Sequence, residues 1–388
     1  MARLRRIIYL VGDLRPELPV LIVGAGPAGL ATAHELSRRR IPYRLFERGP
    51  TLGNSWVNAY DSLQLHTGRH MSVLPGCEYP TGTPLFPTRD QFVNYLREYA
   101  DRASIRVETG RNVRALRRIG DVWVADVDGA EVQGTAVVMA AGIMSNPLSP
   151  AIPGCEDFQG EVIHSVDYRR PDTYRNKRVL VVGVGNSGGE IASELGASGA
   201  DVTILVRQGA NVVPRTIAGI PIQYLAVYIR RLPPGGRKAI ALLLRKLSEL
   251  RVSSTILPRP TWTPLERIPV IGFHLVEAIR ARKVTVKLGA IDRFDQSGVI
   301  FGDGTRADFD AVILATGFAP ALDPLGDLVR RDERGFASRT DDVTSADQPG
   351  LWFVGMRYDT TGAIANINQD AQLVGRRLAS WTVERRLG

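Results

Sequence analysis

The chain has 388 residues, of which 44% are hydrophobic, and it contains no low-complexity tract. This composition excludes a disordered protein and predicts two or three globular domains of ordinary size. The formal net charge is +9, but the basic residues are spread along the chain, which does not favour nucleic-acid binding.

The cysteine content and the first residues bear on the compartment. Cys77 and Cys155 stand far apart, which indicates a reducing compartment and offers no disulfide framework. The basic N-terminal stretch contains an apolar run, residues 7–11, that is too short for a signal peptide core or a membrane span. We therefore expect a soluble, cytoplasmic protein with an extension at 1–18 and no metal site.

The first predicted unit begins with residues 20–23, a continuous apolar run typical of a strand buried on both faces of a parallel sheet. A glycine-rich turn and an amphipathic stretch at 30–39 follow, and "YRLFERG" supplies a second strand. This order predicts a βαβ unit. Farther along, "PTRDQFVNYLREYADR" predicts a helix capped by Thr88, and "NVRALRRI", "VWVADV" and "AVVMAAG" predict short strands.

The first glycine turn, "GAGPAG", has the pattern of a dinucleotide site. Its glycines permit a tight turn, the approach of a pyrophosphate and close helix packing, and the helix N-terminus favours phosphate. The expected contacts are Gly24, Ala25, Gly26, Pro27, Ala28 and Gly29. Glu47, at the end of the next strand, can accept hydrogen bonds from both ribose hydroxyls, so we expect a dinucleotide with a free ribose here.

The second glycine turn has the same setting but a different strand end. The expected contacts are Gly183, Val184, Gly185, Asn186, Ser187 and Gly188. Arg207 stands where the first unit has its glutamate, and a guanidinium suits a 2′-phosphate that a carboxylate would repel. This position predicts a dinucleotide with a 2′-phosphate, although Arg207 alone is also compatible with a solvated strand end.

Two such turns in one chain predict an α/β fold with two Rossmann-like dinucleotide-binding domains, the NADPH domain inserted into the FAD domain. The predicted segments are an FAD domain at 19–157, an NADPH domain at 158–305 and a return to the FAD domain at 306–388. The strands "DAVILATG" and "GLWFVG" are expected to complete the first domain. This pair of cofactors implies hydride transfer from nicotinamide to flavin.

Residues 216–262 change in character, with helical segments that are apolar on one face and basic on the other. A helical insertion packed on the core is the simpler interpretation. The alternative is a substrate-gating pair of helices or a weak membrane-surface contact through 216–250.

A further motif lies between the two turns, where Phe158, Gly160, His164 and Tyr168 form the pattern FxGxxxHxxxY. This pattern resembles the signature of the flavin-containing monooxygenases and their Baeyer–Villiger relatives. The segments "NSWVNAYDSLQLHT", "VVGVGNSGGEIASEL", "VRQGANVVPR" and "LATGF" are similar, in order and approximate spacing, to the YUCCA-like indole-3-pyruvate monooxygenases and their bacterial relatives. The resemblance extends from Pro19 to about Leu378.

The resemblance implies that NADPH reduces FAD and that O₂ then gives a C4a-(hydro)peroxyflavin. This species would oxygenate a small organic substrate, either a 2-oxo acid or ketone by Baeyer–Villiger-type chemistry, or a soft nitrogen or sulfur centre. By resemblance, Trp56 lies against the flavin, and His66 and Arg69 are the candidate catalytic residues. His66 either donates to the peroxide or packs against the cofactor, and Arg69 stands where the branch usually has lysine.

Other enzyme classes share the two-nucleotide layout. An FAD-dependent disulfide reductase needs a closely spaced cysteine pair, which Cys77 and Cys155 do not supply. An NADPH oxidase that releases hydrogen peroxide and a non-catalytic, nicotinamide-sensing flavoprotein remain alternatives.

Overall fold

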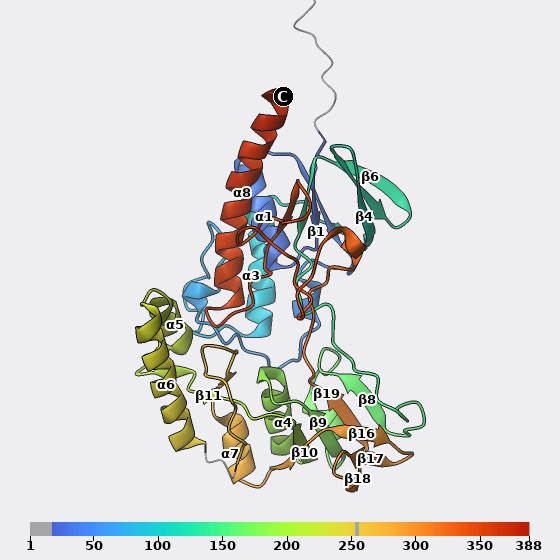
Figure 1. The fold of residues 1–388 in the computed structure, drawn as a ribbon, viewed down its shortest axis with the longest axis vertical. Coiled ribbons are helices and arrows are strands. Elements are labelled where there is room, and N and C mark those ends of the chain that lie inside the picture. Colours follow the sequence, from blue (N-terminus) through green and yellow to red (C-terminus); the bar gives the residue numbers. More distant parts are fainter. Residues whose placement is uncertain (1–17, 253–255, 388) are drawn as a thin grey trace, which may run out of the picture.

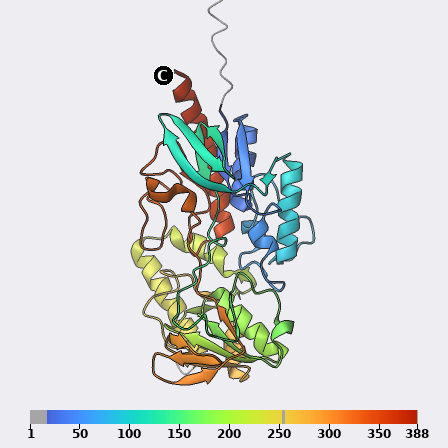
Figure 2. The same cartoon turned by 90° about the vertical axis from the view of Figure 1, so that its right-hand side faces the viewer.

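The computed structural model describes residues 18–252 and 256–387 and consists of two lobes, each built on a five-stranded parallel sheet (Figure 1). The lobes follow one another along the long axis of the molecule in both views (Figures 1 and 2). The predicted α/β fold with two Rossmann-like units is confirmed.

The sheet of the first lobe has the order β20-β7-β1-β2-β3. Its strands are β1 (Val20–Val23), β2 (Tyr43–Glu47), β3 (Glu108–Thr109), β7 (Ala136–Met139) and β20 (Leu351–Phe353). One face packs on α1 (Pro27–Arg38), α3 (Arg89–Arg102) and α8 (Ala363–Leu387). The other face packs on an antiparallel sheet of β4 (Val113–Ile119), β5 (Val122–Val127) and β6 (Ala130–Gly134).

This sandwich explains the apolar run that begins the first unit. Val20 and Ile22 of β1 belong to the core under the helices, whereas Leu21 and Val23 belong to the core under the antiparallel sheet. The predicted helix is also confirmed as α3. The side chain of Thr88 accepts from the backbone N–H of Gln91, and the Gln91 side chain accepts from the backbone N–H of Thr88.

The second lobe repeats the design, with the strand order β15-β10-β9-β19-β8. Its strands are β8 (Glu161–His164), β9 (Arg178–Val182), β10 (Asp201–Val206), β15 (Val284–Leu288) and β19 (Ala311–Leu314). Helices α4 (Asn186–Ser198) and α7 (His274–Arg280) cover one face. The other face packs on an antiparallel sheet of β16 (Ile291–Phe294), β17 (Gly298–Phe301) and β18 (Arg306–Asp308).

The prediction that the chain returns to the first lobe at residue 306 is wrong. Strand β19, the "AVIL" of "DAVILATG", pairs in parallel with β9 and β8 of the second sheet, and β18 pairs with β17. Only β20, from "GLWFVG", pairs with β7 and completes the first sheet. Both segments are short buried strands that end in glycine, so their residue pattern does not specify which sheet receives them.

The two chain segments that connect the lobes pair with each other, and we call them the connecting ribbon (residues 142–148 and 317–321). Pro147 and Phe318 form an antiparallel bridge. The N–H of Leu148 donates to the carbonyl of Gly317 at 3.0 Å, and that of Ala319 donates to Asn146 at 3.0 Å.

The helical insertion contains two helices, α5 (Ile222–Arg230) and α6 (Pro234–Arg251), on the outer flank of the molecule (Figure 1). Residues 216–221, predicted to be part of the helical stretch, instead form a hairpin of β12 (Thr216–Ile217) and β13 (Ile220–Pro221). Further short elements are α2 (Asn54–Val57), β11 (Val212–Val213), β14 (Val270–Ile271) and the 3-10 helices η2 (Arg69–Met71), η3 (Pro171–Tyr174) and η4 (Asp323–Leu328). Among the described residues, no helix combines the length and apolar character needed to cross a membrane.

Candidate functional site

The first glycine turn joins β1 to α1 by very close backbone packing. Gly24 has φ +99°, and a Cβ there would lie 2.7 Å from the carbonyl oxygen of Ala140. A Cβ on Gly29 would lie 1.9 Å from the carbonyl oxygen of Gly24, so neither position accepts a side chain. At Gly26, by contrast, no described heavy atom lies within 4 Å of the ideal Cβ. The turn therefore exposes backbone at the point where a phosphate would approach.

Glu47 closes this turn from the end of β2. Its carboxylate is 8% exposed and accepts from the N–H of Ala25 at 2.9 Å and from the N–H of Gly49 at 2.9 Å. Each carboxylate oxygen keeps a further lone pair, and Glu47 lines the adjacent cavity. The carboxylate thus orders the turn and remains able to accept from a ligand hydroxyl.

The adjacent cavity has a volume of about 660 Å³ and is bounded by both lobes. The first lobe contributes the glycine turn, Trp56 and the start of α8, where Ile364 and Ile367 line the wall. The Trp56 ring lies edge-on to Phe92, with the centroids 4.5 Å apart. The loop after β8 contributes Val166, Asp167 and Arg169.

The second glycine turn repeats the packing of the first. Gly183 has φ +108°, and a Cβ on Gly188 would lie 2.1 Å from the Gly183 carbonyl oxygen, whereas Gly185 again has open space. The predicted contact Asn186 uses its side chain within the protein. It donates to the carbonyl of Pro269 at 3.1 Å and accepts from the N–H of Ile271 at 2.8 Å. Val184 and Ser187 are half-buried beside it.

Arg207 follows β10, the strand next to β9 in the parallel sheet, so it lies at the same sheet edge as the second turn. Its side chain is exposed, and it has no hydrogen bond or ion pair within the part of the chain that the structure describes. The guanidinium is therefore available to an anionic ligand. The two strand ends differ, with a buried carboxylate in one unit and an exposed guanidinium in the other.

The FxGxxxHxxxY residues join elements of the second lobe. Phe158 packs on Phe294 with ring centroids 5.1 Å apart, and a Cβ on Gly160 would lie 2.4 Å from the Phe158 ring. His164 contacts the carbonyl of Gly317 through Nε2 at 3.1 Å and accepts from the N–H of Val166 through Nδ1 at 3.1 Å. Burial lowers the pKa of His164, which matches this neutral tautomer.

The fourth signature residue, Tyr168, is 1% exposed and donates to Glu194 of α4 at 3.2 Å. His164 and Tyr168 thus fix the loop after β8 against the segment after β19 and against α4, and this loop supplies one wall of the cavity. The signature residues therefore have a structural role in this fold.

His66 lies at the boundary between the lobes. Its Nε2 is 2.6 Å from Glu190 Oε1 on α4, and Tyr60 donates its hydroxyl to the other oxygen of the same carboxylate. His274 of α7 stands 3.9 Å from Glu190. The residues around 60–66 of the first lobe are therefore bound to the first helix of the second lobe. His66 does not line the cavity, and its predicted catalytic role stays a prediction.

Sequence reasoning missed Glu190 as a partner of His66, because the two residues are 124 positions apart. The available signal was an acidic residue directly after the glycines of "GNSGGE", near the start of an apolar helix, where a carboxylate needs a partner.

The two glutamates of α4 have opposite pKa shifts. Burial opposes the ionisation of Glu190, but the hydrogen bonds from His66 and Tyr60 outweigh it, and its pKa lies below the ordinary value. At Glu194 burial outweighs the hydrogen bonds from Ser62 and Tyr168, and the pKa is raised. Folding therefore favours the charged form of Glu190 and the neutral form of Glu194.

Arg69, the other predicted catalytic residue, is hydrogen-bonded within the first lobe. Its guanidinium donates to the carbonyl of Thr83, and its backbone N–H donates to Leu85 at 2.7 Å. The preceding Gly68 approaches α5 closely, since a Cβ there would lie 2.5 Å from the Tyr224 hydroxyl. Arg69 lines neither the cavity described above nor the second one, so its placement gives no support to a catalytic role.

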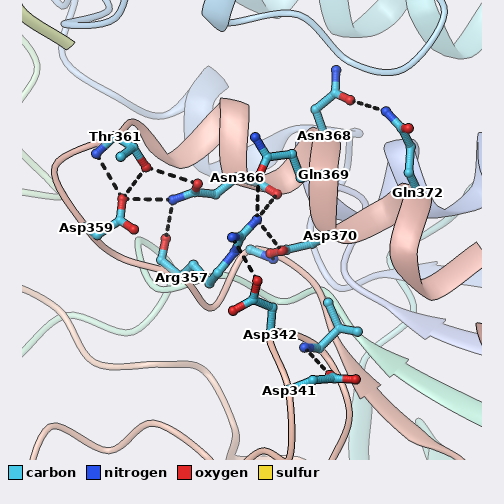
Figure 3. Close-up of polar contacts among 12 residues, drawn as sticks. Asp341, Asp342, Arg357, Asp359, Thr361, Asn366, Asn368, Gln369, Asp370 and Gln372 are labelled. Carbon is cyan, nitrogen blue, oxygen red and sulfur yellow. Dashed lines mark hydrogen bonds and ion pairs between the residues drawn. The ribbon is translucent and has the colours of Figure 1, made fainter. Parts of the chain in front are cut away.

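A polar network holds the segment "TGAIANINQDA" at the start of α8 (Figure 3). Arg357, 10% exposed at its side chain, pairs with the buried Asp370 at 2.7 Å and with Asp342 at 3.1 Å. Asp359 accepts from the backbone N–H of Thr361 at 2.9 Å and from Asn366 at 3.0 Å. Burial raises the pKa of Asp370 to about 6, although Arg357 opposes the shift.

The start of α8 lines both the first cavity and a second one of about 770 Å³. Asn366, Asn368 and Gln369 face the second cavity, whereas Ile364 and Ile367 face the first. Basic and aromatic side chains dominate the opposite wall of the second cavity: His70, Tyr224, Tyr228, Arg230 and Arg231. No sequence motif predicted this cavity, because α5 and α8 are far apart in the chain.

Exchanging Glu190 for glutamine should lower the free energy of unfolding at neutral pH by about 1–3 kcal/mol, because His66 and Tyr60 lose a charged partner. The folded-state pKa of Glu190 is depressed, so its contribution is present above the pKa of the unfolded chain and is lost as the pH falls. Denaturant titrations at several pH values should therefore show the variant and the parent converging in acid.

Glu194, one turn along the same helix, is the matched control. Its raised pKa means that folding favours the protonated form, so stability from this group is lost as the pH rises. Glu194→Gln should consequently leave stability at neutral pH unchanged or slightly increased. Equal losses in both variants would show that α4 simply tolerates no change at this interface.

Comparison with known proteins agrees with this geometry. The model of the pyridine nucleotide-disulphide oxidoreductase family matches residues 21–220. Indole-3-pyruvate monooxygenase YUCCA1 of Oryza sativa subsp. japonica is 34% identical over 329 residues, which cover 80% of this chain and 80% of that protein.

Among solved structures, a flavin-containing monooxygenase from Stenotrophomonas maltophilia superposes with a TM-score of 0.72 at 23% identity, covering 94% of this chain and 99% of that one. Cyclohexanone monooxygenase from Rhodococcus sp. Phi1, bound to NADP⁺, gives a TM-score of 0.73 at 19% identity, covering 94% and 84%. These structures share the fold. The chain belongs to the pyridine nucleotide-disulphide oxidoreductase family and, within it, to the flavin-dependent monooxygenases that include the YUCCA-type enzymes.

Proposed function

We propose that the protein is an NADPH- and O₂-dependent flavoprotein monooxygenase that forms a C4a-(hydro)peroxyflavin and oxygenates a small organic substrate. The observation that carries the proposal is the pair of glycine turns. The two turns share one packing arrangement. The next strand of each unit leads to a different residue, Glu47 in the first unit and Arg207 in the second, and these residues suit two different dinucleotides.

The first site fits FAD. The open space at Gly26 admits a pyrophosphate beside the backbone, and the N-terminus of α1 adds favourable partial charge. Glu47 would accept from the ribose, and Trp56 would pack beside the ring system in the cavity of about 660 Å³. FAD would supply the hydride acceptor and the activation of O₂.

The second site fits NADPH. Gly185 leaves its backbone open at the start of α4, and the exposed Arg207 would pair with the 2′-phosphate. The side chain of Asn186 orders the turn, so this residue would contact the pyrophosphate through its backbone N–H.

The contact with Glu190 restricts what His66 can do. If its Nε2–H donates to the carboxylate, the neutral ring has only an acceptor at Nδ1. Donation from His66 to an oxygenated cofactor would therefore require a ring that carries both protons. A ring that only packs against the cofactor has no such requirement.

The second cavity supports a 2-oxo acid over a neutral ketone or a soft nitrogen or sulfur centre as the substrate. Arg230 and Arg231 lie in its wall beside two tyrosines, which is suitable for an anionic, partly aromatic molecule. Arg230 is already paired with Asp359 at 3.1 Å, which leaves Arg231 as the better candidate for a substrate carboxylate.

A disulfide reductase does not fit the geometry. Cys77 packs against the core of the first lobe, whereas Cys155 packs against the core of the second. Neither cysteine lines the cavity of about 660 Å³.

An NADPH oxidase that forms hydrogen peroxide would use the same cofactor contacts as the proposed monooxygenase, so only kinetic measurements can separate the two. Contact of residues 216–250 with a membrane is a separate proposal that rests on the outer face of α6.

Mixing the NADPH-reduced holoenzyme with O₂ in a stopped-flow spectrometer tests the reaction class. We expect a transient flavin spectrum distinct from both the reduced and the oxidised forms, because both lobes border the cavity and a flavin bound there would be partly shielded from water. Direct return to oxidised flavin with an equal amount of hydrogen peroxide would establish an oxidase instead. Absence of flavin reduction by NADPH would favour a sensor.

Replacing Arg207 with alanine tests the nucleotide assignment. The substitution removes a charge-assisted contact with the 2′-phosphate, so the Kd for NADPH should rise about tenfold or more while that for NADH changes little. Anaerobic flavin reduction at varied nucleotide concentration measures both constants. Arg207→Lys should retain part of the preference, and equal losses for the two nucleotides would remove Arg207 from the 2′-phosphate site.

Replacing Arg231 with glutamine tests the substrate class. The exposed arginine should contribute about 1 kcal/mol to binding of a carboxylate, so the KM for phenylpyruvate should rise about fivefold and that for cyclohexanone should not change. The measurement is substrate-stimulated NADPH consumption corrected for peroxide. Arg237→Gln, on α6 outside the cavity, is the control, and an unchanged KM in Arg231→Gln would argue against this cavity.

A further inference from the structure

The outer face of α6 carries an apolar stripe that the described protein leaves exposed. Residues 239, 242, 243, 246, 247 and 250 recur at helical spacing and form one side of the helix. Four of them are leucines with large exposed fractions: Leu242 at 46%, Leu243 at 57%, Leu247 at 48% and Leu250 at 82%. The stripe is continuous, unlike isolated surface leucines, which are common in soluble proteins.

The inner face of the same helix places one leucine, Leu244, against the core and otherwise uses small or polar residues at its buried positions. Ala241 is 5% exposed and Ser248 is 7% exposed, and the Ser248 hydroxyl oxygen accepts from the N–H of Val212 at 3.2 Å. An amphipathic helix that stabilises a core normally turns its leucines inward. Here Ala241, Leu244 and Ser248 anchor the helix, so the four leucines of the stripe are free to meet another surface.

The surroundings of the stripe are strongly basic. Residues 222–251 contain seven arginine and lysine residues and a single acid, Glu249. Glu249 pairs with Arg245 at 3.1 Å, and Arg230 pairs with Asp359 at 3.1 Å, so within the described part of the chain two of the seven cations have an acidic partner and the net charge of the segment stays positive. Lys246 lies within the stripe itself, and the long aliphatic stem of a lysine can lie along apolar surface while its ammonium group reaches the polar boundary.

These features favour one kind of partner. The charged residues of α6 exclude a membrane-spanning orientation, but they suit a helix that lies in the plane of a bilayer surface. A second copy of this chain would bring two basic surfaces together, which is unfavourable, whereas an anionic bilayer complements the charge. The helix lies on the outer flank of the molecule, where a flat surface can reach it (Figure 1).

We propose that α5 and α6 form a docking surface for membranes that contain anionic lipids. Leu242, Leu243, Leu247 and Leu250 enter the boundary between headgroups and acyl chains, and the basic residues contact the headgroups. Binding of this kind is peripheral and weakens with salt.

Flotation of the full-length holoenzyme with vesicles tests the proposal. We expect binding to phosphatidylcholine vesicles that contain phosphatidylserine, and little binding to phosphatidylcholine alone. The double variant Leu243→Ser, Leu247→Ser should reduce the bound fraction about tenfold, and Lys246→Glu should reduce it severalfold while keeping the apolar stripe. Both variants should retain the parent's flavin content and its NADPH consumption in solution, since these residues lie outside both cavities.

Ile119→Ser is the matched control, because Ile119 is 58% exposed on β4, in the other lobe, and its loss should leave vesicle binding unchanged. Sedimentation velocity of the same proteins detects the competing partner. A dimer that dissociates in the leucine variant, without vesicle binding by the parent, would overturn the proposal in favour of self-association. Equal binding by the parent and both α6 variants, or loss of binding on removal of residues 1–17 alone, would also overturn it.

Discussion

The structure depends on backbone-to-backbone contact where each lobe's first helix meets its first strand. At Gly29 and Gly188 the helix lies so close to the carbonyl oxygen of the turn's first glycine that no side chain fits. This contact fixes the helix directly above the carboxyl end of the sheet. The N–H groups of the first helical turn then point at the space beside the strand ends, which is where parallel sheets bind phosphates.

The two sites differ in the residue at the end of the second strand of each unit. In the first lobe the carboxylate of Glu47 accepts from two backbone N–H groups and so stabilises the turn as well as facing the cavity. In the second lobe the turn is instead held by Asn186, and Arg207 makes no contact with it. One residue combines structure and recognition in the first unit, whereas two residues divide these tasks in the second.

Local features of the chain were predictable from the sequence, and long-range ones were not. The buried strand β1, the capped helix α3 and the contrast between Glu47 and Arg207 follow from neighbouring residues, and the structure has them. The assignment of β19 failed because strands buried on both faces look alike in any parallel sheet. The sequence also did not show which way the apolar face of α6 is turned, because periodicity reveals an apolar stripe but not what covers it.

The candidate site shows the same division. Gly24, Gly26, Glu47 and Trp56 line one cavity, and these residues stand in short segments of fixed geometry. The contact between His66 and Glu190 and the second cavity arise from packing between segments more than 100 residues apart. Such contacts have no periodic signature in a single sequence.

The connecting ribbon has a mechanical consequence for the whole molecule. Its two antiparallel segments are hydrogen-bonded to each other on the way between the lobes, so they resist stretching and sliding but can bend and twist together. Rotation about this ribbon is therefore the reorientation of the lobes that keeps its hydrogen bonds. The contacts of Glu190 with His66 and Tyr60, and of Glu194 with Ser62, also cross the boundary between the lobes, so a large rotation must break several hydrogen bonds at once.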